Sequence, residues 1–331
     1  MSRISRYQQS IDKFIQTKSS LTTISDNNKS HLNVLYKNID HLIAICLVSI
    51  LNNKCKKEKL KFHGYYIASG IDVGFIIAQI MDRYNYYKNE IGDNNLTNLL
   101  PELLSTMYQS LSGNIDSLKL NVDLSETMRI NQYCINYMSQ KIHKLVSVNN
   151  YETTDRIHKT DFIDYKFKDD KAKENYRNLK YISDEKLLEH IDNKYGTICK
   201  MALIFGWLFG LGDEKELSYL EELGKSMGRI FKIAYDFDNI DSDLEKTYDC
   251  DNNSDSNYSS NIVINMGIKN SVVLFLDNKA KLVEGLLKLK IWSTTIKEIL
   301  DLIEQKIDDG LERSNIDEKL EFSDFSSLLD K

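Results

Sequence analysis

The sequence predicts an all-α fold, because residues that break helices are scarce and apolar residues recur at helical spacing. The chain of 331 residues contains a single proline, Pro101, and only 14 glycines. All-β and α/β proteins of this length need many more turn residues. Hydrophobic residues make up 42% of the chain and charged residues 28%, the balance of a globular protein that can bury a sizeable core.

In the first half of the chain, apolar residues repeat every three or four positions over five stretches. The first stretch begins at Ile4 and Tyr7, and the polar residues 19–30 that follow predict a loop. Pro101 is compatible with a helix if it lies in the first turn, where no N–H is needed. The expected helices cover residues 4–15, 32–52, 65–87, 96–111 and 124–148.

The second half continues the helical pattern but contains two polar segments. Over residues 149–176 the apolar periodicity fades, which predicts a long loop or an exposed helix that is mobile. Residues 249–261 are almost entirely polar and cannot repay the entropy of ordering, so we expect a flexible surface loop. Asp184 is the expected cap of the next helix. The expected helices cover residues 184–195, 197–211, 214–245, 268–289 and 293–310.

Several classes of protein are excluded by composition. The net charge is −6 with dispersed basic residues, which leaves no electrostatic footprint for nucleic acid. The longest apolar runs are shorter than the ~20 residues of a membrane span, so we expect buried core helices. The five cysteines have no CxxC spacing, and the N-terminus lacks the apolar core of a secretory signal. We therefore expect free thiols in a cytoplasmic protein. Since no linker separates the helices, residues 1–331 are expected to form one domain.

The most informative stretch runs from Gly224 to Glu245, where an apolar helix carries carboxylates towards its C-terminal end. It resembles the second aspartate-rich helix of the trans-isoprenyl diphosphate synthases (the polyprenyl synthetase family), which usually reads Phe-Gln-x-x-Asp-Asp-x-x-Asp. Residues 195–210 look like the family's Lys-Thr-Ala helix, and residues 72–82 fall where the family has Glu-Leu-Ile-His-x-x-Ser-Leu-Ile-His-Asp, so that Asp82 begins the first acidic set. The resemblance covers about residues 30–310, and divergent members from large DNA viruses are the nearest in pattern.

This resemblance implies a single bundle of antiparallel helices around a deep central cavity. It also implies the family's chemistry, in which isopentenyl diphosphate condenses with an allylic diphosphate. That reaction requires Mg²⁺ between two facing sets of carboxylates, together with basic residues that clamp the diphosphates. The family commonly dimerises through its central helices, so we expect a homodimer or a heteromer.

The two acidic sets are eroded in this chain. The first set would be Asp82, Arg83 and Tyr86, and the second would be Tyr235, Asp236 and Asn239, so each set keeps one carboxylate. At about 100° per residue, a continuous helix adds Asp243 to the face of Asp236, and it adds Lys232 in place of the family's Gln. The candidate metal ligands are therefore Asp82, Asp236, Asn239 and Asp243.

The diphosphate-binding residues are also incomplete. The Lys of the Lys-Thr-Ala motif is replaced by Gly196, and the Gly-Gly-Lys-Arg segment is reduced to Lys37-Asn38. The candidates that remain for diphosphate binding are Arg83, Lys88, Thr197 and Lys232. The resemblance assigns the cavity wall to Phe75, Ala78, Gln79, Tyr86 and Tyr235.

Each acidic residue also has a structural interpretation. Asp82 can be a capped or paired aspartate, and Asp236 with Asp243 can be a vestigial pair neutralised by Lys232. Three further acids, Asp238, Asp241 and Glu245, share the opposite face and fit a solvated helix end.

Three functions remain open: a Mg²⁺-dependent prenyltransferase, a catalytically inactive structural or interaction protein or partner subunit, and a protein that binds an isoprenoid or lipid in the cavity. The eroded motifs favour weak or absent activity. In that case we expect Arg83 and Lys232 to point inward and to form ion pairs with the surviving aspartates in place of Mg²⁺.

Overall fold

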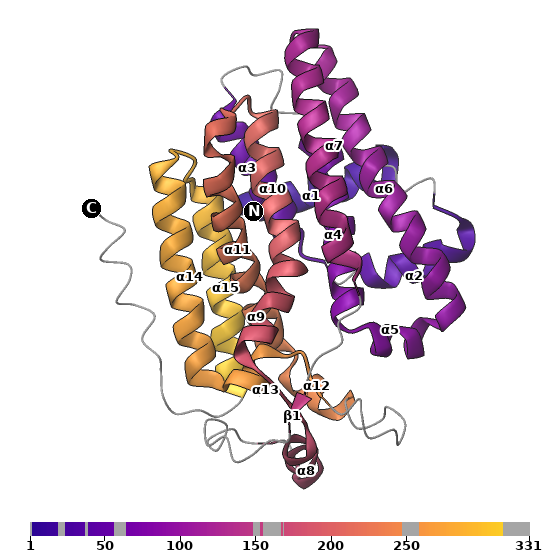
Figure 1. The fold of residues 1–331 in the computed structure, drawn as a ribbon, viewed down its shortest axis with the longest axis vertical. Helices are drawn as coiled ribbons and strands as arrows, with labels where there is room; N and C mark the ends of the chain where they lie inside the picture. Colours follow the sequence, from indigo (N-terminus) through magenta and orange to yellow (C-terminus); the bar gives the residue numbers. More distant parts are fainter. Residues whose placement is uncertain are drawn as a thin grey trace.

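The computed structural model describes residues 2–18, 24–36, 39–55, 64–147, 153–154, 167, 169–246 and 258–313. Nearly all of these residues are helical, which confirms the all-α prediction. Long helices run side by side and form one bundle, with α14 and α15 on one side and α6 and α7 on the other (Figure 1).

The first half of the chain contributes seven of the described helices. They are α1 (Arg3–Lys18), α2 (Asp26–Tyr36), α3 (Leu42–Lys54), α4 (Gly64–Asp82), α5 (Tyr84–Ile91), α6 (Asp93–Lys119) and α7 (Leu124–Val146).

The second half adds the remaining helices and one short strand pair, in which β1 (Thr153–Thr154) lies antiparallel to β2 (Tyr181–Ile182). The helices are α8 (Asp170–Asn178), α9 (Asp184–Asn193), α10 (Tyr195–Phe209), the 3-10 turn Glu214–Glu216, α11 (Leu217–Asp238), α12 (Ile240–Lys246), α13 (Ile262–Met266), α14 (Ile268–Lys288) and α15 (Thr294–Arg313).

Helix α10 lies at the centre of the bundle. All but one of its residues are buried, and it packs against α3, α4, α7, α9 and α11. Two glycines of α11 make its contact with α10 especially close. A Cβ at Gly228 would lie 2.4 Å from the backbone nitrogen of Gly196, and one at Gly224 would lie 2.5 Å from the Cα of Lys200. Only glycine fits at these two positions.

The predicted helix over residues 32–52 is wrong as a single element, because α2 ends at Tyr36 and α3 begins only at Leu42. His41 adopts a left-handed φ of 60° immediately before α3. Such a conformation costs about 1–3 kcal/mol and persists only where neighbouring contacts fix it. His41 is held by hydrogen bonds to two carboxylates, Asp72 and Asp12. Helix α2 also begins at Asp26, inside the expected loop.

The predicted helix over residues 65–87 is likewise divided, at Arg83, which leaves helical geometry (φ −122°, ψ 43°) between α4 and α5. Helix α6 is longer than predicted, so Pro101 lies in its interior and not in its first turn. The cap of α9 is Ser183, whose hydroxyl accepts from the backbone N–H of Lys186, while Asp184 is the first helical residue.

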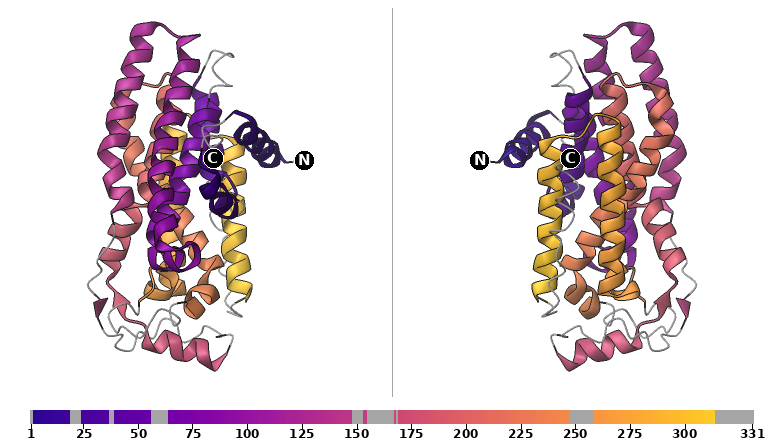
Figure 2. Two further views of the ribbon diagram at one scale, coloured as in Figure 1. Left: turned by 90° about the vertical axis from the view of Figure 1, so that its right-hand side faces the viewer. Right: turned by 90° about the vertical axis from the view of Figure 1, so that its left-hand side faces the viewer.

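Most of the two predicted polar segments lies outside the described residues. Within 149–176 the structure describes residues 153–154, 167 and 169–176, and within 249–261 it describes only residues 258–261. Helix α8 crosses one end of the bundle (Figure 2). In the part of the chain that is described, α4 alone is long and apolar enough to cross a membrane, but 83% of its apolar window is buried in the bundle, as in a core helix.

Candidate functional site

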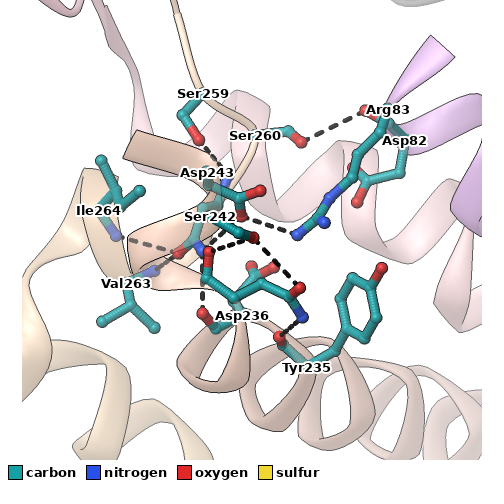
Figure 3. Close-up of polar contacts among 12 residues, drawn as sticks. Asp82, Arg83, Tyr235, Asp236, Ser242, Asp243, Ser259, Ser260, Val263 and Ile264 are labelled. Carbon is teal, nitrogen blue, oxygen red and sulfur yellow. Dashed lines mark hydrogen bonds and ion pairs between the residues drawn. The ribbon is translucent and has the colours of Figure 1, made fainter. Parts of the chain in front are cut away.

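The C-terminal ends of α4 and α11 meet in a buried polar network (Figure 3). Its centre is Lys232, whose ammonium lies 2.7 Å from a carboxylate oxygen of Asp82 and 2.7 Å from one of Asp236. The side chains of all three residues are fully buried. The prediction that Lys232 points inward and forms ion pairs with surviving aspartates is therefore confirmed.

Both oxygens of Asp82 are occupied by protein donors. Oδ1 lies 2.7 Å from Nε2 of His190 in α9, and Oδ2 accepts from the Tyr195 hydroxyl at 3.1 Å as well as from Lys232. Burial would raise the pKa of Asp82, but Lys232, His190 and Arg83 outweigh it and hold this pKa below its ordinary value. Burial lowers the pKa of His190, so this imidazole is an uncharged donor at neutral pH.

Both carboxylate oxygens of Asp236 also accept hydrogen bonds from protein donors. Oδ1 accepts from Lys232, and Oδ2 accepts at 2.7 Å from the backbone N–H of Ile262, the first residue of α13. An anion at a helix N-terminus is favoured by the orphan N–H groups there. Burial, opposed by Lys232 and reinforced by Asp82, raises the pKa of Asp236 to about 7.

Asn261 connects α13 to this network by hydrogen bonds. Its side-chain oxygen caps α13 by accepting from the N–H groups of Val263 and Ile264, and its amide donates to the Asp236 carbonyl and to Oδ2 of Asp243, both at 2.9 Å. One residue earlier, the Ser260 hydroxyl donates to the carbonyl of Asp82. The segment after the acidic motif therefore closes directly onto the aspartates.

Arg83 provides the second inward cation, as expected. Its guanidinium lies 2.7 Å from Asp243 and 4.7 Å from the centre of the Tyr235 ring. Burial raises the pKa of Asp243, and the charge of Arg83 opposes that shift. Asp243 lies on α12, because α11 ends at Asp238, so the prediction of one continuous helix over residues 214–245 is wrong.

The other predicted site residues have different locations and contacts. Asn239 is the C-cap residue that follows α11, and it donates its amide to the Tyr235 carbonyl at 2.7 Å. Lys88 is half-exposed on α5 and pairs with Asp93 at 3.3 Å. Thr197 is buried inside α10. Three acids, Asp238, Asp241 and Glu245, are exposed, as predicted for a solvated helix end.

The residues assigned to the cavity wall pack against other side chains. Phe75 and Tyr235 both contact the ring of Tyr195, and Tyr86 contacts Tyr87. Ala78 and Gln79 are buried in α4. One turn earlier, a Cβ at Gly74 would lie 2.6 Å from Cδ1 of Ile198 and 3.0 Å from Cε of Met107, so α4, α6 and α10 are in direct contact at that level.

Sequence reasoning missed His190, Tyr195 and Asn261, which come from three separate segments. It also missed Lys194, which is fully buried and donates to the carbonyls of Lys144, Leu145 and Ser147 at the C-terminal end of α7. Burial lowers the pKa of Lys194 to about 8. Lys194 lies two positions before Gly196, which stands where the family has its motif lysine, so its place in the sequence could have indicated it. Its side chain, however, points to α7 and not to the aspartates.

The described residues do not fit a Mg²⁺ ion. They contain no group of three or more histidine, cysteine, aspartate or glutamate side chains placed to hold a metal. Mg²⁺ requires oxygen ligands in near-octahedral geometry. The four carboxylate oxygens of Asp82 and Asp236 already accept hydrogen bonds from the protein.

Two solved structures have an arrangement of helices similar to that of this chain. A Helicobacter pylori 26695 geranyltransferase superposes with a TM-score of 0.55 and 13% identity, covering 92% of this chain and 96% of its own. A Marinomonas sp. MED121 protein assigned as a farnesyl-diphosphate synthase gives 0.53 and 12% identity, covering 92% of this chain and 98% of its own.

The chain has the isoprenyl diphosphate synthase fold. No family model and no curated protein sequence matches it. The similarity therefore concerns the backbone fold. The buried Asp82–Lys232–Asp236 network is formed by side chains of this chain.

Proposed function

We propose that this protein is a catalytically silent member of the isoprenyl synthase fold, a cytoplasmic structural or interaction protein that works as a homodimer or as a partner subunit. The observation that carries the proposal is Lys232, a fully buried ammonium placed between the two aspartates at 2.7 Å from each. In this proposal, the lysine supplies the positive charge that Mg²⁺ supplies in an active prenyltransferase.

The energetics of buried charge support this proposal. An ion pair buried away from water is strongly destabilised when one partner is lost, because the other charge is left uncompensated. A metal ion would have to displace an ammonium that already binds both carboxylates, and it would also have to compete with the donors His190, Tyr195 and Ile262. The second cation, Arg83, is engaged by Asp243 and is not free to clamp a diphosphate.

The two alternatives have less support. An active enzyme of the resembled type needs its carboxylates turned towards metal and its cations turned towards diphosphate, whereas here the two sets bind one another. Isoprenoid or lipid binding between α4, α6 and α10 needs open space, whereas Met107 and Ile198 lie against Gly74.

The direct test is an isopentenyl transfer assay with radiolabelled isopentenyl diphosphate, farnesyl diphosphate and Mg²⁺. We expect no product above a protein-free blank, and no Mg²⁺-dependent shift in melting temperature when farnesyl diphosphate is added. Mg²⁺-dependent product from the wild-type chain that disappears in Asp236→Ala would refute the proposal. The same assay on Lys232→Gln, which restores the family's residue, tests whether the lysine alone blocks the reaction.

A further inference from the structure

A second group of charged side chains lies where α7, α9, α10 and α11 pack together, around Lys200. Lys200 is the one residue of α10, a helix that the structure describes in full, that is not buried. Its side chain lies on Gly224 of α11, where a Cβ would be 2.8 Å from Cγ of Lys200. Lys200 follows Tyr195, whose hydroxyl bonds Asp82, by five residues, or about 140° around α10 and about 7.5 Å along it. The group is therefore separate from the aspartate–lysine network.

Two further lysines reach this place from the helices on either side of α10. Lys141 of α7 lies 3.2 Å from Glu221 of α11, so this ion pair joins α7 to α11. Lys225 of α11 lies 3.4 Å from Asp192 of α9. The charges of these two lysines and of their two carboxylate partners all act on Lys200. Lysines from three different helices therefore converge around one point on the surface of the bundle.

This group, called the Lys200 cluster, has four positive charges against two negative ones. Arg229 of α11 donates to both carboxylate oxygens of Asp192 at 2.8 Å, so this aspartate is already occupied where Lys225 approaches it. Among the residues that the structure describes, Lys200 forms no hydrogen bond and no ion pair. The surplus positive charge is therefore centred on Lys200. The members of the cluster are Lys141, Lys200, Lys225, Arg229, Glu221 and Asp192.

The position of Lys200 is unfavourable as long as no anion is bound. Burial lowers the pKa of Lys200 against the opposing charges of Asp192 and Glu221, and Lys141 and Lys225 lower this pKa further. Like charges held together in a partly dehydrated place raise the free energy of the charged form. A bound anion would offset this cost and would accept hydrogen bonds from the lysines. An ammonium group is a compact charge with three donors, and it is a common ligand of phosphate.

We propose that the surface over Lys200, between Lys141 and Lys225, binds a doubly charged phosphate group. The two negative charges of the ligand equal the surplus charge of the Lys200 cluster, and each of the three ammonium groups can donate to a different phosphate oxygen. The group can come from a free phosphate ion or from a small phosphate monoester, which present the same chemistry to the lysines. The site does not depend on the proposed function, since it uses none of the residues of the aspartate–lysine network.

The test is calorimetric titration of the full chain with inorganic phosphate at pH 7.5, with the ionic strength held constant by sodium chloride. We expect saturable binding, and at least about tenfold weaker binding by Lys200→Met, which keeps the alkyl chain but removes the charged donor. Lys119→Met, which removes the same charge from an exposed ion pair on α6, should leave the affinity within about twofold. A parallel titration with phenyl phosphate distinguishes the sources, because tighter binding of phenyl phosphate indicates a monoester and equal or weaker binding indicates the free ion.

A second variant is expected to act in the opposite direction, which no general loss of structure would do. Glu221→Gln removes a negative charge beside Lys200 and releases Lys141 from its ion pair, so it should strengthen phosphate binding about threefold. Circular dichroism and the melting temperature show whether each variant is folded. The proposal is overturned if the wild-type chain binds neither inorganic phosphate nor phenyl phosphate saturably, if folded Lys200→Met binds with unchanged affinity, or if Glu221→Gln weakens binding.

Discussion

Lys232 is the residue on which the buried network most depends, because it is the only cation in direct contact with both Asp82 and Asp236 among the residues the structure describes. Its pKa is raised, since the charges of the two aspartates outweigh the effect of burial, so it remains charged over the whole physiological range. The two aspartates would otherwise repel each other in a site from which water is excluded.

We predict that Lys232→Gln lowers the free energy of unfolding by about 3–5 kcal/mol, the usual cost of removing one partner of a buried ion pair. Urea denaturation measures this, and Lys119→Gln is the control because it breaks an exposed pair with Asp116 and should cost at most about 1 kcal/mol. The triple variant Lys232→Met, Asp82→Asn, Asp236→Asn should regain most of the loss. Equal costs for the two single lysine variants would show that the network is not stabilised by Lys232.

The same residue shows how far sequence could predict the site. Helical spacing placed Lys232 on the face of Asp236, and the resemblance placed Asp82 opposite, so the ion pairs followed from the residues. The spacing alone could not supply His190 or Asn261, because their approach to the aspartates is set by the packing of α9 and α13 against α11. Tertiary contacts between distant segments leave no periodic signal in the sequence.

At the scale of elements, the apolar pattern located α7, α10 and α14 within about two residues, because α7 and α14 each bury a regular apolar face and α10 is apolar on nearly all sides. It failed to predict the two interruptions of the helices, at His41 before α3 and at Arg83 after α4. At both positions side-chain contacts, and not helix propensity, determine the backbone conformation. At the first break His41 bonds two carboxylates, and at the second Arg83 reaches Asp243. Both breaks occur at residues with charged partners on other helices.

His41, which immediately precedes α3, should make stability dependent on pH. Its pKa is about 9 in the folded chain against an ordinary value of 6.5, so its contribution is fully present below pH 6.5 and is lost as the pH rises through 9. A shift of this size corresponds to about 3 kcal/mol. Comparing the free energy of unfolding of the wild-type chain and His41→Gln at pH 6 and pH 10 measures it. We expect the difference between the two proteins to shrink at pH 10, and parallel pH curves would contradict the assignment.

At the scale of the whole molecule, the side formed by α6 and α7 (Figure 1) carries apolar residues that the bundle does not bury. Leu124 and Met128 lie one turn apart on α7 and are 66% and 60% exposed, and Leu120 at the end of α6 is 80% exposed. Exposed apolar side chains that gather into a contiguous patch mark interaction surfaces, so this side is a candidate interface. We propose this side as the dimer interface, in place of the central helices that the resemblance implies.

We predict that the chain is a dimer through this face and that Leu124→Glu with Met128→Glu makes it a monomer, because burying two carboxylates in an apolar interface is costly. Light scattering coupled to size-exclusion chromatography measures the mass at several concentrations. Val273→Glu is the control, since Val273 is a similarly exposed apolar residue, 53% accessible, but lies on α14. The double variant should keep the wild-type melting temperature of the isolated bundle, because neither side chain contributes to the buried core. A wild-type chain that stays monomeric at high concentration, or a dimer that Val273→Glu disrupts and the double variant does not, would place the interface elsewhere.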